Sequence, residues 1–240
     1  MKIEQNATFL LELVRRVHTG QLAPAAFQRP YVWDREAVMA LCTSILEGYP
    51  IGGFLSWRPG QHADITKLGR KRLGPTLLNA AGYGSALLLD GQNRLATLAW
   101  MLRDTGDPIP ADLSDAEQAT WGCGEELIAD LAAQELRFVP HAQADKGLTL
   151  PAAALFDSRI ANGYIRKRWN DQWRNYSDEE RDAGLKWQDN CSRAFRDARV
   201  VETILNDATP EQARKAFLHI CRVGVPMSQE DFDAAIGWTD

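Results

Sequence analysis

The 240-residue sequence lacks the long apolar runs that would place it in a membrane. Its uninterrupted apolar runs span only a few residues, as at 86–89, whereas a helix needs about 20 to cross a bilayer. The N-terminal segment contains no apolar signal core followed by a cleavage site. These absences predict a cytoplasmic protein with no membrane partner.

Clustered cysteines and histidines are also missing. A disulfide framework is unusual in a chain of this size without a secretion signal, and zinc sites need closely spaced ligands. No C-x-x-C pair is present, so we expect neither a disulfide framework nor a structural zinc. The residues concerned are Cys42, Cys123, Cys191, Cys221, His18, His62, His141 and His219.

Positive charge is not in excess, because the formal net charge is −5. This balance excludes a protein that coats nucleic acid through bulk charge, but not one with a local basic surface. The charge is unevenly spread: 104–135 has acids and no Lys or Arg, whereas 58–72 is basic. The 45% apolar content, without repeats or low-complexity tracts, is typical of a globular domain and excludes collagen-like, coiled-coil and wholly disordered chains.

Hydrophobic periodicity and turn residues predict the elements of the first hundred residues. Asp34 is expected to cap one helix, and Gly48 to end it. Gly106 is expected to end the helix that follows the strand at 86–89. The predicted elements are a helix over 8–19, an extended segment over 21–33, a helix over 35–47, a strand over 54–57, a loop or hairpin over 58–79, a strand over 86–89 and a helix from 92.

The later residues are predicted to be largely helical. Residues 126–139 fit either a helix or a hairpin, and 151–200 read mainly as helix. A strand is expected over 200–205, followed by a helix capped by Thr209 and Gln212. The last predicted elements are a helix end at Gly224 and Pro226, and a short helix begun by Ser228 and Asp231.

The strongest chemical signal is a strand, turn and helix that read ALLL-DGQNR-LATLAWML. The free N–H groups and the dipole of a helix start favour an anion, and Gly91 lets a ligand approach the backbone. Gln92 and Asn93 add amides, and Arg94 adds a planar fork that suits phosphate. Asp90 could hold a divalent cation or orient a water. Alternatively, Asp90 and Gly91 form an ordinary cap and turn, and Arg94 is a surface cation.

Two further segments carry weaker signals. Residues 26–33 (AFQRPYVW) could place Gln28 and Arg29 beside the same pocket, or could serve only as aromatic core staples with a structural ion pair. Basic and aromatic residues interleave over 166–174, which suits phosphate backbones and bases but is equally typical of a solvated helix face over a Trp core stripe. The candidate DNA contacts are Arg70, Lys71, Arg72, Arg166, Lys167 and Arg168.

Together these segments resemble the N-terminal domain of GmrSD-type, modification-dependent restriction enzymes. The family has an FQR-x-Y-x-W segment, a SIL-x-GYPIG turn, a DGQQR box and a closing F-x-x-I-N-x-x-G-x-x-(L/M)-S segment. Here they read FQRPYVW, SILEGYPIG, DGQNR and FLHICRVGVPMS, over about 20–236. The closing segment comprises Phe217, Ile220, Cys221, Gly224 and Ser228.

The resemblance implies an α+β fold, a ParB/sulfiredoxin-like small mixed-sheet core with a largely helical second half. We expect a single domain over 1–240, with the core at about 8–106 and 191–236 and a mostly helical insertion at 107–190. It also implies a nucleoside-triphosphate site at the box, with hydrolysis that gates DNA restriction in defence against phage. A C-terminal HNH-type nuclease often follows in relatives; this sequence has no such histidine cluster, so the nuclease is expected in cis or in trans.

Two positions depart from the family pattern. Asn93 stands where Gln is usual, which shortens the amide by one methylene. Cys221 stands where Asn is usual, which removes a strong donor and acceptor. Both departures bear on whether this chain hydrolyses nucleotide or only binds it.

The leading hypothesis is therefore a nucleotide-binding, NTP-hydrolysing regulatory domain that uses ATP or GTP and Mg²⁺. Asp90, Gln92, Arg94 and Arg29 are its candidate catalytic residues; Gln28, Arg29 and 91–94 would bind the nucleotide, and Asp90 would bind the metal. One alternative is a DNA-binding or modification-sensing module without hydrolysis, and another is a ParB-like nuclease. The latter has only Asp90 as a carboxylate near the box, whereas two-metal sites need several. DNA, modified or not, and a second copy of the chain are the other expected partners.

Overall fold

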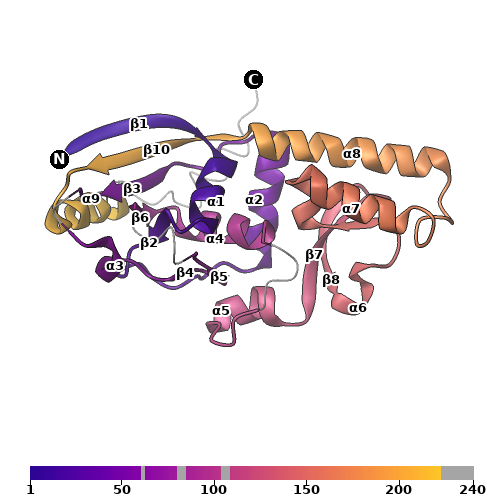
Figure 1. The fold of residues 1–240 in the computed structure, drawn as a ribbon, viewed down its shortest axis with the longest axis horizontal. Coiled ribbons are helices and arrows are strands. Elements are labelled where there is room, and N and C mark those ends of the chain that lie inside the picture. The colour runs from indigo at the N-terminus through magenta and orange to yellow at the C-terminus, as the bar shows by residue number, and fades with distance from the viewer. Residues whose placement is uncertain (61–62, 80–84, 104–108, 223–240) are drawn as a thin grey trace, which may run out of the picture.

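The computed structural model describes residues 1–60, 63–79, 85–103 and 109–222, and in 221–222 only the backbone. It is an α+β structure, as the sequence predicted (Figure 1). The elements of the N-terminal part are β1 (Lys2–Phe9), α1 (Leu10–His18), β2 (Leu22–Pro24), α2 (Arg35–Glu47), β3 (Phe54–Arg58), α3 (Ile65–Leu68), β4 (Arg72–Leu73), β5 (Thr76–Leu77), β6 (Ala86–Asp90) and α4 (Gln92–Met101).

The later elements alternate short strands with longer helices. They are α5 (Asp115–Glu117), the π-helical turn η2 (Gln118–Gly122), β7 (Glu125–Asp130), β8 (Glu135–Pro140), α6 (His141–Ala144), β9 (Thr149–Pro151), the 3₁₀ turn η3 (Ala152–Leu155), α7 (Ser158–Arg168), α8 (Asp178–Asp197), β10 (Arg199–Asn206) and α9 (Pro210–Arg222). None of the helices in the described ranges is both long and apolar enough to cross a membrane.

A mixed five-stranded sheet with the order β1-β10-β3-β6-β2 forms the centre of the N-terminal part. β10, from near the end of the chain, lies between β1 and β3; it is antiparallel to β1 and parallel to β3. β3 is antiparallel to β6, and β6 is parallel to β2. This arrangement brings the C-terminal ends of β2 and β6 to the same edge, where the 26–33 segment and the DGQNR box begin.

Helices cover both faces of this sheet because its strands alternate between two apolar layers. On one face, Leu88 packs with α1, α2 and α4 in the main core. On the other face, Leu55, Trp57 and Leu87 form a smaller core with Ala213 of α9. The α2 boundaries follow from local chemistry: Asp34 accepts the Ala37 N–H, and Gly48 ends the helix with a φ of 77°.

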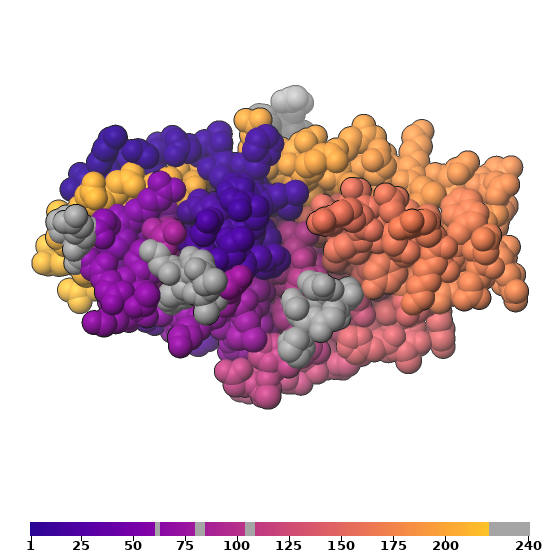
Figure 2. All heavy atoms as spheres, in the orientation of Figure 1, coloured from indigo at the N-terminus to yellow at the C-terminus, as the bar shows by residue number. Residues whose placement is uncertain are grey.

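The residues from β7 to α8 form a second part of the molecule, at the right of Figures 1 and 2. A three-stranded sheet, β8-β7-β9, packs there with α7 and α8. The hairpin interpretation of 126–139 is thus correct, and the predicted helical insertion also contains a sheet. Trp173 is fully buried, so the aromatic stripe of this segment belongs to the core.

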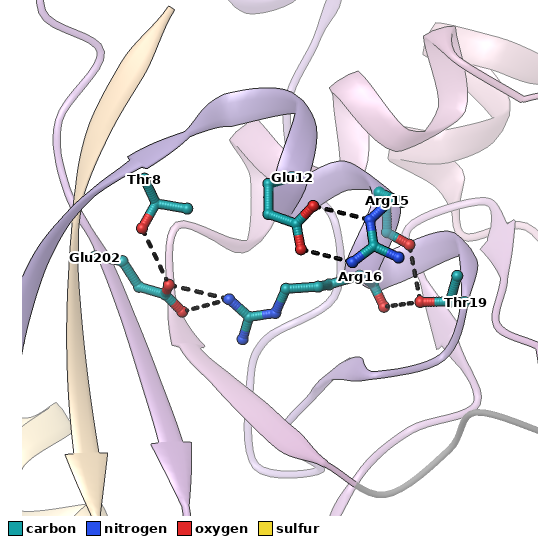
Figure 3. A network of polar contacts seen from close by, with 6 residues as sticks. All are labelled: Thr8, Glu12, Arg15, Arg16, Thr19 and Glu202. Atoms are coloured by element: carbon teal, nitrogen blue, oxygen red, sulfur yellow. Dashed lines mark hydrogen bonds and ion pairs between the residues drawn. The ribbon is translucent and has the colours of Figure 1, made fainter.

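A buried ion pair joins α1 to the central sheet (Figure 3). The Arg16 guanidinium donates to both carboxylate oxygens of Glu202 at 2.9 and 3.0 Å. Ser56 Oγ donates to the same carboxylate at 2.8 Å, and Thr8 Oγ1 at 3.4 Å. The buried negative charge is therefore compensated by a cation and hydroxyls, as burial requires.

Several predicted boundaries were wrong. The first helix begins at Leu10 instead of residue 8, because Thr8 and Phe9 pair with β10. A strand that was not predicted, β1, precedes this helix. Residues 58–79 contain a helical turn in addition to the hairpin. The predicted helix ends at Gly106, Gly224 and Pro226 and the short helix at Ser228 lie outside the described residues.

Candidate functional site

A cavity of about 590 Å³ opens where β6 turns into α4. The DGQNR box forms one side of it, and the 26–33 segment and α9 form the others. The structure therefore brings together the box and the FQR segment, which lie some 60 residues apart in sequence. The cavity is lined by Phe27, Gln28, Arg29, Trp33, Asp90, Gly91, Gln92, Asn93, Arg94 and Phe217.

Gly91 makes the sharp turn between strand and helix. Its φ of 90° lies in the left-handed region, and a Cβ there would overlap the Phe54 ring. Glycine is therefore required by both conformation and space. No side chain caps the helix that follows, so the first N–H groups of α4 are not used by a capping residue.

Gln92 has a buried polar atom without a partner. The residue is only 8% exposed, and its Oε1 accepts no hydrogen bond from the described residues. An unsatisfied buried acceptor costs about 1–3 kcal/mol, so a ligand that donates a hydrogen bond to Gln92 Oε1 would remove this cost. The Gln92 amide could therefore accept a hydrogen bond from a ligand hydroxyl. If the amide rotated by 180°, its nitrogen would face the same position and could donate to a phosphate oxygen.

Arg94 is held against the protein instead of projecting freely into the cavity. Its guanidinium donates to the Ile51 carbonyl, pairs with the Asp90 carboxylate at 3.6 Å and lies over the Phe54 ring at 4.9 Å. Burial lowers the pKa of Arg94 from its ordinary value, and Asp90 partly opposes this effect. A Cβ at Gly52 would overlap the same guanidinium, which explains the second glycine-dependent turn of the site.

The amides of Asn93 and Gln28 connect the two motifs. Asn93 Oδ1 accepts the Val32 N–H at 3.2 Å. Gln28 is 6% exposed, and its Nε2 donates to the carbonyls of Leu88, at 3.2 Å, and Leu89. The side-chain oxygen of Asn93 and the side-chain nitrogen of Gln28 thus form hydrogen bonds that join the FQR segment to the box and to the strand before it.

Arg29 and the aromatic walls remain open to a ligand. Arg29 is exposed and forms no ion pair with the described residues. Phe27 is 47% exposed, and its ring lies 5.2 Å from that of Phe217. Trp33 is partly buried against the core. An aromatic wall, in which the Phe27 and Phe217 rings are tilted by 56° to each other, beside the exposed Arg29 is suited to a ligand with an aromatic ring and an anionic group.

The candidate DNA contacts divide into two groups. Arg70 donates to the backbone carbonyls of Ala26 and Gln28, and Arg72 pairs with buried Glu117 at 3.3 Å. Arg168 is 3% exposed and contacts Asp145 and Thr149, so it does not face solvent. The other three, Lys71, Arg166 and Lys167, are exposed.

Acidic groups are sparse at the cavity. Among the described residues that line it, Asp90 is the one carboxylate. In the described ranges, no three His, Cys, Asp or Glu residues come together in a way that could hold a metal ion. A divalent cation here would therefore need ligand oxygens, such as those of a nucleotide, in addition to Asp90.

The sequence did not predict which residues outside the box contact Gly91 and Arg94. Ile51, Gly52 and Phe54 hold Arg94 and Gly91 in place. The paired glycines of YPIGG were a signal, but they were interpreted only as a turn. Of the closing segment, Phe217 lines the cavity, whereas Ile220 is 48% exposed. The Cys221 side chain, Gly224 and Ser228 lie outside the described residues.

Comparison with known families agrees with this geometry. The model of the GmrSD restriction endonuclease N-terminal domain matches residues 10–235, nearly the whole chain. The chain belongs to this family. The matched range contains the described residues that line the cavity.

The GmrSD-family chain is also similar to an uncharacterized protein of Methanocaldococcus jannaschii. The two are 30% identical over 113 residues, which is 45% of this chain and 19% of the relative. The match thus covers about a fifth of the length of that relative.

Proposed function

We propose that this GmrSD-family domain binds a nucleoside triphosphate in the cavity at the DGQNR box and hydrolyses it to control DNA restriction. The observation that carries the proposal is the uncapped start of α4 beside Gln92, whose buried Oε1 has no partner among the described residues, at a cavity of about 590 Å³. That volume suits a nucleotide, since ligand pockets commonly measure about 300–1,000 Å³.

Each part of the cavity has a role in this proposal. The α4 N–H groups and Arg29 bind phosphate oxygens, because a helix start and a guanidinium both favour negative charge. Phe27 and Phe217 contact the base. Asp90 lies where it would bind Mg²⁺ together with the phosphates or orient the attacking water.

Arg94 requires a rearrangement to act on the nucleotide. Asp90 and the Ile51 carbonyl satisfy it in the free protein, so a phosphate must compete with these partners. We therefore assign Arg29 the main role in charge neutralisation. Arg94 holds Asp90 and the 49–53 turn, and it joins the phosphates only if Asp90 turns toward Mg²⁺.

Phosphate release and thermal unfolding test the proposal. Purified protein is assayed with ATP, GTP, CTP and UTP plus Mg²⁺, with and without modified DNA. The wild type should release phosphate from at least one nucleotide and be stabilised by it. Arg29→Ala should lower kcat/KM by about 100-fold, since an arginine on a transferring phosphoryl group contributes at least this much.

The matched control is Arg174→Ala, which removes an exposed arginine far along the chain from the cavity residues. It should leave hydrolysis unchanged. No stabilisation and no turnover with any of the four nucleotides would contradict the proposal. In that case salt-dependent DNA binding that requires Lys71, Arg166 and Lys167 would favour a DNA-binding module instead.

DNA and a nuclease complete the proposed system. Lys71, Arg166 and Lys167 are the exposed members of the candidate DNA contacts, and they would bind DNA phosphates on an otherwise acidic protein. The nuclease would be supplied by a further domain or a separate subunit. A ParB-like nuclease activity of the cavity itself has less support, because Asp90 is its one lining carboxylate.

A further inference from the structure

The Arg70 side chain is fastened to the segment that carries Arg29. Its Nη2 donates to the carbonyl of Ala26 at 2.9 Å and to that of Gln28 at 2.6 Å, and its Nε donates to Ala26 at 3.3 Å. One guanidinium thus holds the carbonyls on both sides of Phe27. A rigid planar fork can do this with little loss of freedom for each bond formed.

The backbone around Arg70 supports the same segment. The Arg70 N–H donates to the Pro24 carbonyl at 2.8 Å, and the Ala26 N–H donates to the Leu68 carbonyl at 2.7 Å. Ala25 and Gly69 form an antiparallel bridge between these bonds. The 65–70 segment therefore works as a short brace along the first residues of the FQR segment.

The far end of the FQR segment is fastened differently. Val32 is held by Asn93, and Tyr31 Oη lies 2.9 Å from Thr97 Oγ1. Arg29 lies between these anchors and the brace. Its exposed guanidinium has no ion pair in the described residues, so only the backbone fixes its position. Removing the Arg70 hydrogen bonds should therefore increase the mobility of Arg29 and Phe27 and leave the α4 helix intact.

We infer that Arg70 is a positioning residue of the nucleotide site, which orients Arg29 and Phe27 from outside the cavity, and not a DNA contact. This inference rests on the proposed function for its link to nucleotide binding, although the effect on the loop stands independently of it. The three bonds to carbonyls occupy Nε and Nη2, so the bidentate Nε–Nη2 edge is not available to a DNA phosphate and Nη1 alone would have to bind it.

Hydrogen–deuterium exchange and nucleotide affinity test the inference with Arg70→Ala, Arg70→Lys and Lys71→Ala. Lys71 is the matched control, because it is the adjacent residue, is basic and is exposed. Arg70→Ala should speed amide exchange across 26–33 by at least about tenfold, because the segment opens more often without the Arg70 hydrogen bonds. The Kd of the nucleotide that binds the wild type should rise about tenfold, and Lys71→Ala should change neither quantity.

Arg70→Lys separates charge from geometry. A lysine replaces arginine well as a point charge on DNA phosphate, but its ammonium cannot reproduce a fork over two carbonyls. Arg70→Lys should therefore fall between the wild type and Arg70→Ala in loop exchange. If Arg70→Ala does not fold, Arg70→Lys alone carries the comparison.

The outcomes distinguish the two proposals. If the wild type binds none of the four nucleotides, the proposed function fails, and faster exchange confined to 26–33 still supports the brace. Wild-type exchange across 26–33 in Arg70→Ala would overturn the inference, as would equal weakening of nucleotide binding by Arg70→Ala and Lys71→Ala. DNA binding lost in Arg70→Ala and kept in Arg70→Lys, with unchanged exchange, would restore Arg70 as a DNA contact.

Discussion

Replacing Gln92 with leucine should stabilise the free protein while it weakens ligand binding. The side chain is buried, and its Oε1 has no partner in the described residues. Leucine has a similar volume and removes the unsatisfied acceptor, which costs about 1–3 kcal/mol when buried. We therefore expect Gln92→Leu to raise the free energy of unfolding by about 1–2 kcal/mol. In a chain of this size, where 1 kcal/mol corresponds to about 2–4 °C, the midpoint of thermal unfolding should rise by about 2–8 °C.

The matched control is Gln188, a glutamine that is equally buried but whose amide is hydrogen-bonded. It is 9% exposed, almost the same as Gln92, but its Nε2 donates to Ser192 Oγ at 2.8 Å and to the Ala154 carbonyl at 3.2 Å. Gln188→Leu should therefore lower the free energy of unfolding by about 1–2 kcal/mol, because the partners lose their donor. The same substitution at equal burial should thus change stability in opposite directions.

Urea denaturation, followed by circular dichroism with and without nucleotide, measures both effects. Without nucleotide, Gln92→Leu should unfold at higher urea than the wild type. With saturating nucleotide the order should reverse, because the variant loses the ligand contact. The reasoning is refuted if Gln92→Leu is destabilised without ligand, or if nucleotide stabilises it as much as the wild type.

Three further predictions concern the surroundings of the site. Gly52→Ala should lower the free energy of unfolding by at least about 2 kcal/mol, because a left-handed backbone and the buried Arg94 guanidinium both oppose a Cβ. Gly48 has an equally left-handed backbone but open space around it, so Gly48→Ala should lower the free energy of unfolding by about 1 kcal/mol. Urea titration measures both. Glu202→Gln should lower stability by about 3 kcal/mol, because it leaves the buried arginine uncompensated; unchanged stability would contradict this (Figure 3). Burial raises the pKa of Cys42 to about 12, so its thiol should stay protonated and resist iodoacetamide at pH 8 until the protein is unfolded; peptide mapping would reveal early modification.

Local sequence chemistry was sufficient for elements whose ends are fixed within a few residues. The α9 start illustrates this: the Thr209 N–H donates to Gln212 Oε1 at 2.9 Å, and Thr209 Oγ1 accepts the Gln212 N–H at 3.3 Å. Both groups of this capping box lie within four consecutive residues. The alternating pattern of 126–139 was harder, because the apolar spacing of a short segment satisfies helix and hairpin alike.

Long-range partners could not be predicted from the sequence. Arg70 and Arg168 lie in basic runs that suggest nucleic acid, yet one holds backbone carbonyls and the other is buried with Asp145. An arginine can donate to a phosphate, a carboxylate or a carbonyl, and the sequence does not show which of these is its partner. Likewise, the box indicated an anion site, but only the fold places the Ile51 carbonyl where it accepts a hydrogen bond from Arg94.

The place of β10 in the central sheet has a consequence for synthesis of the chain. Among the described residues β1 pairs with 199–206, so after it leaves the ribosome this strand must wait for one made about 200 residues later. At about 5–20 residues per second, this wait lasts about 10–40 s. During that interval the nascent chain carries an unpaired β1, and β3 lacks the neighbour that fixes its edge. Chaperone binding to the growing chain is therefore expected to end when residues 199–206 emerge.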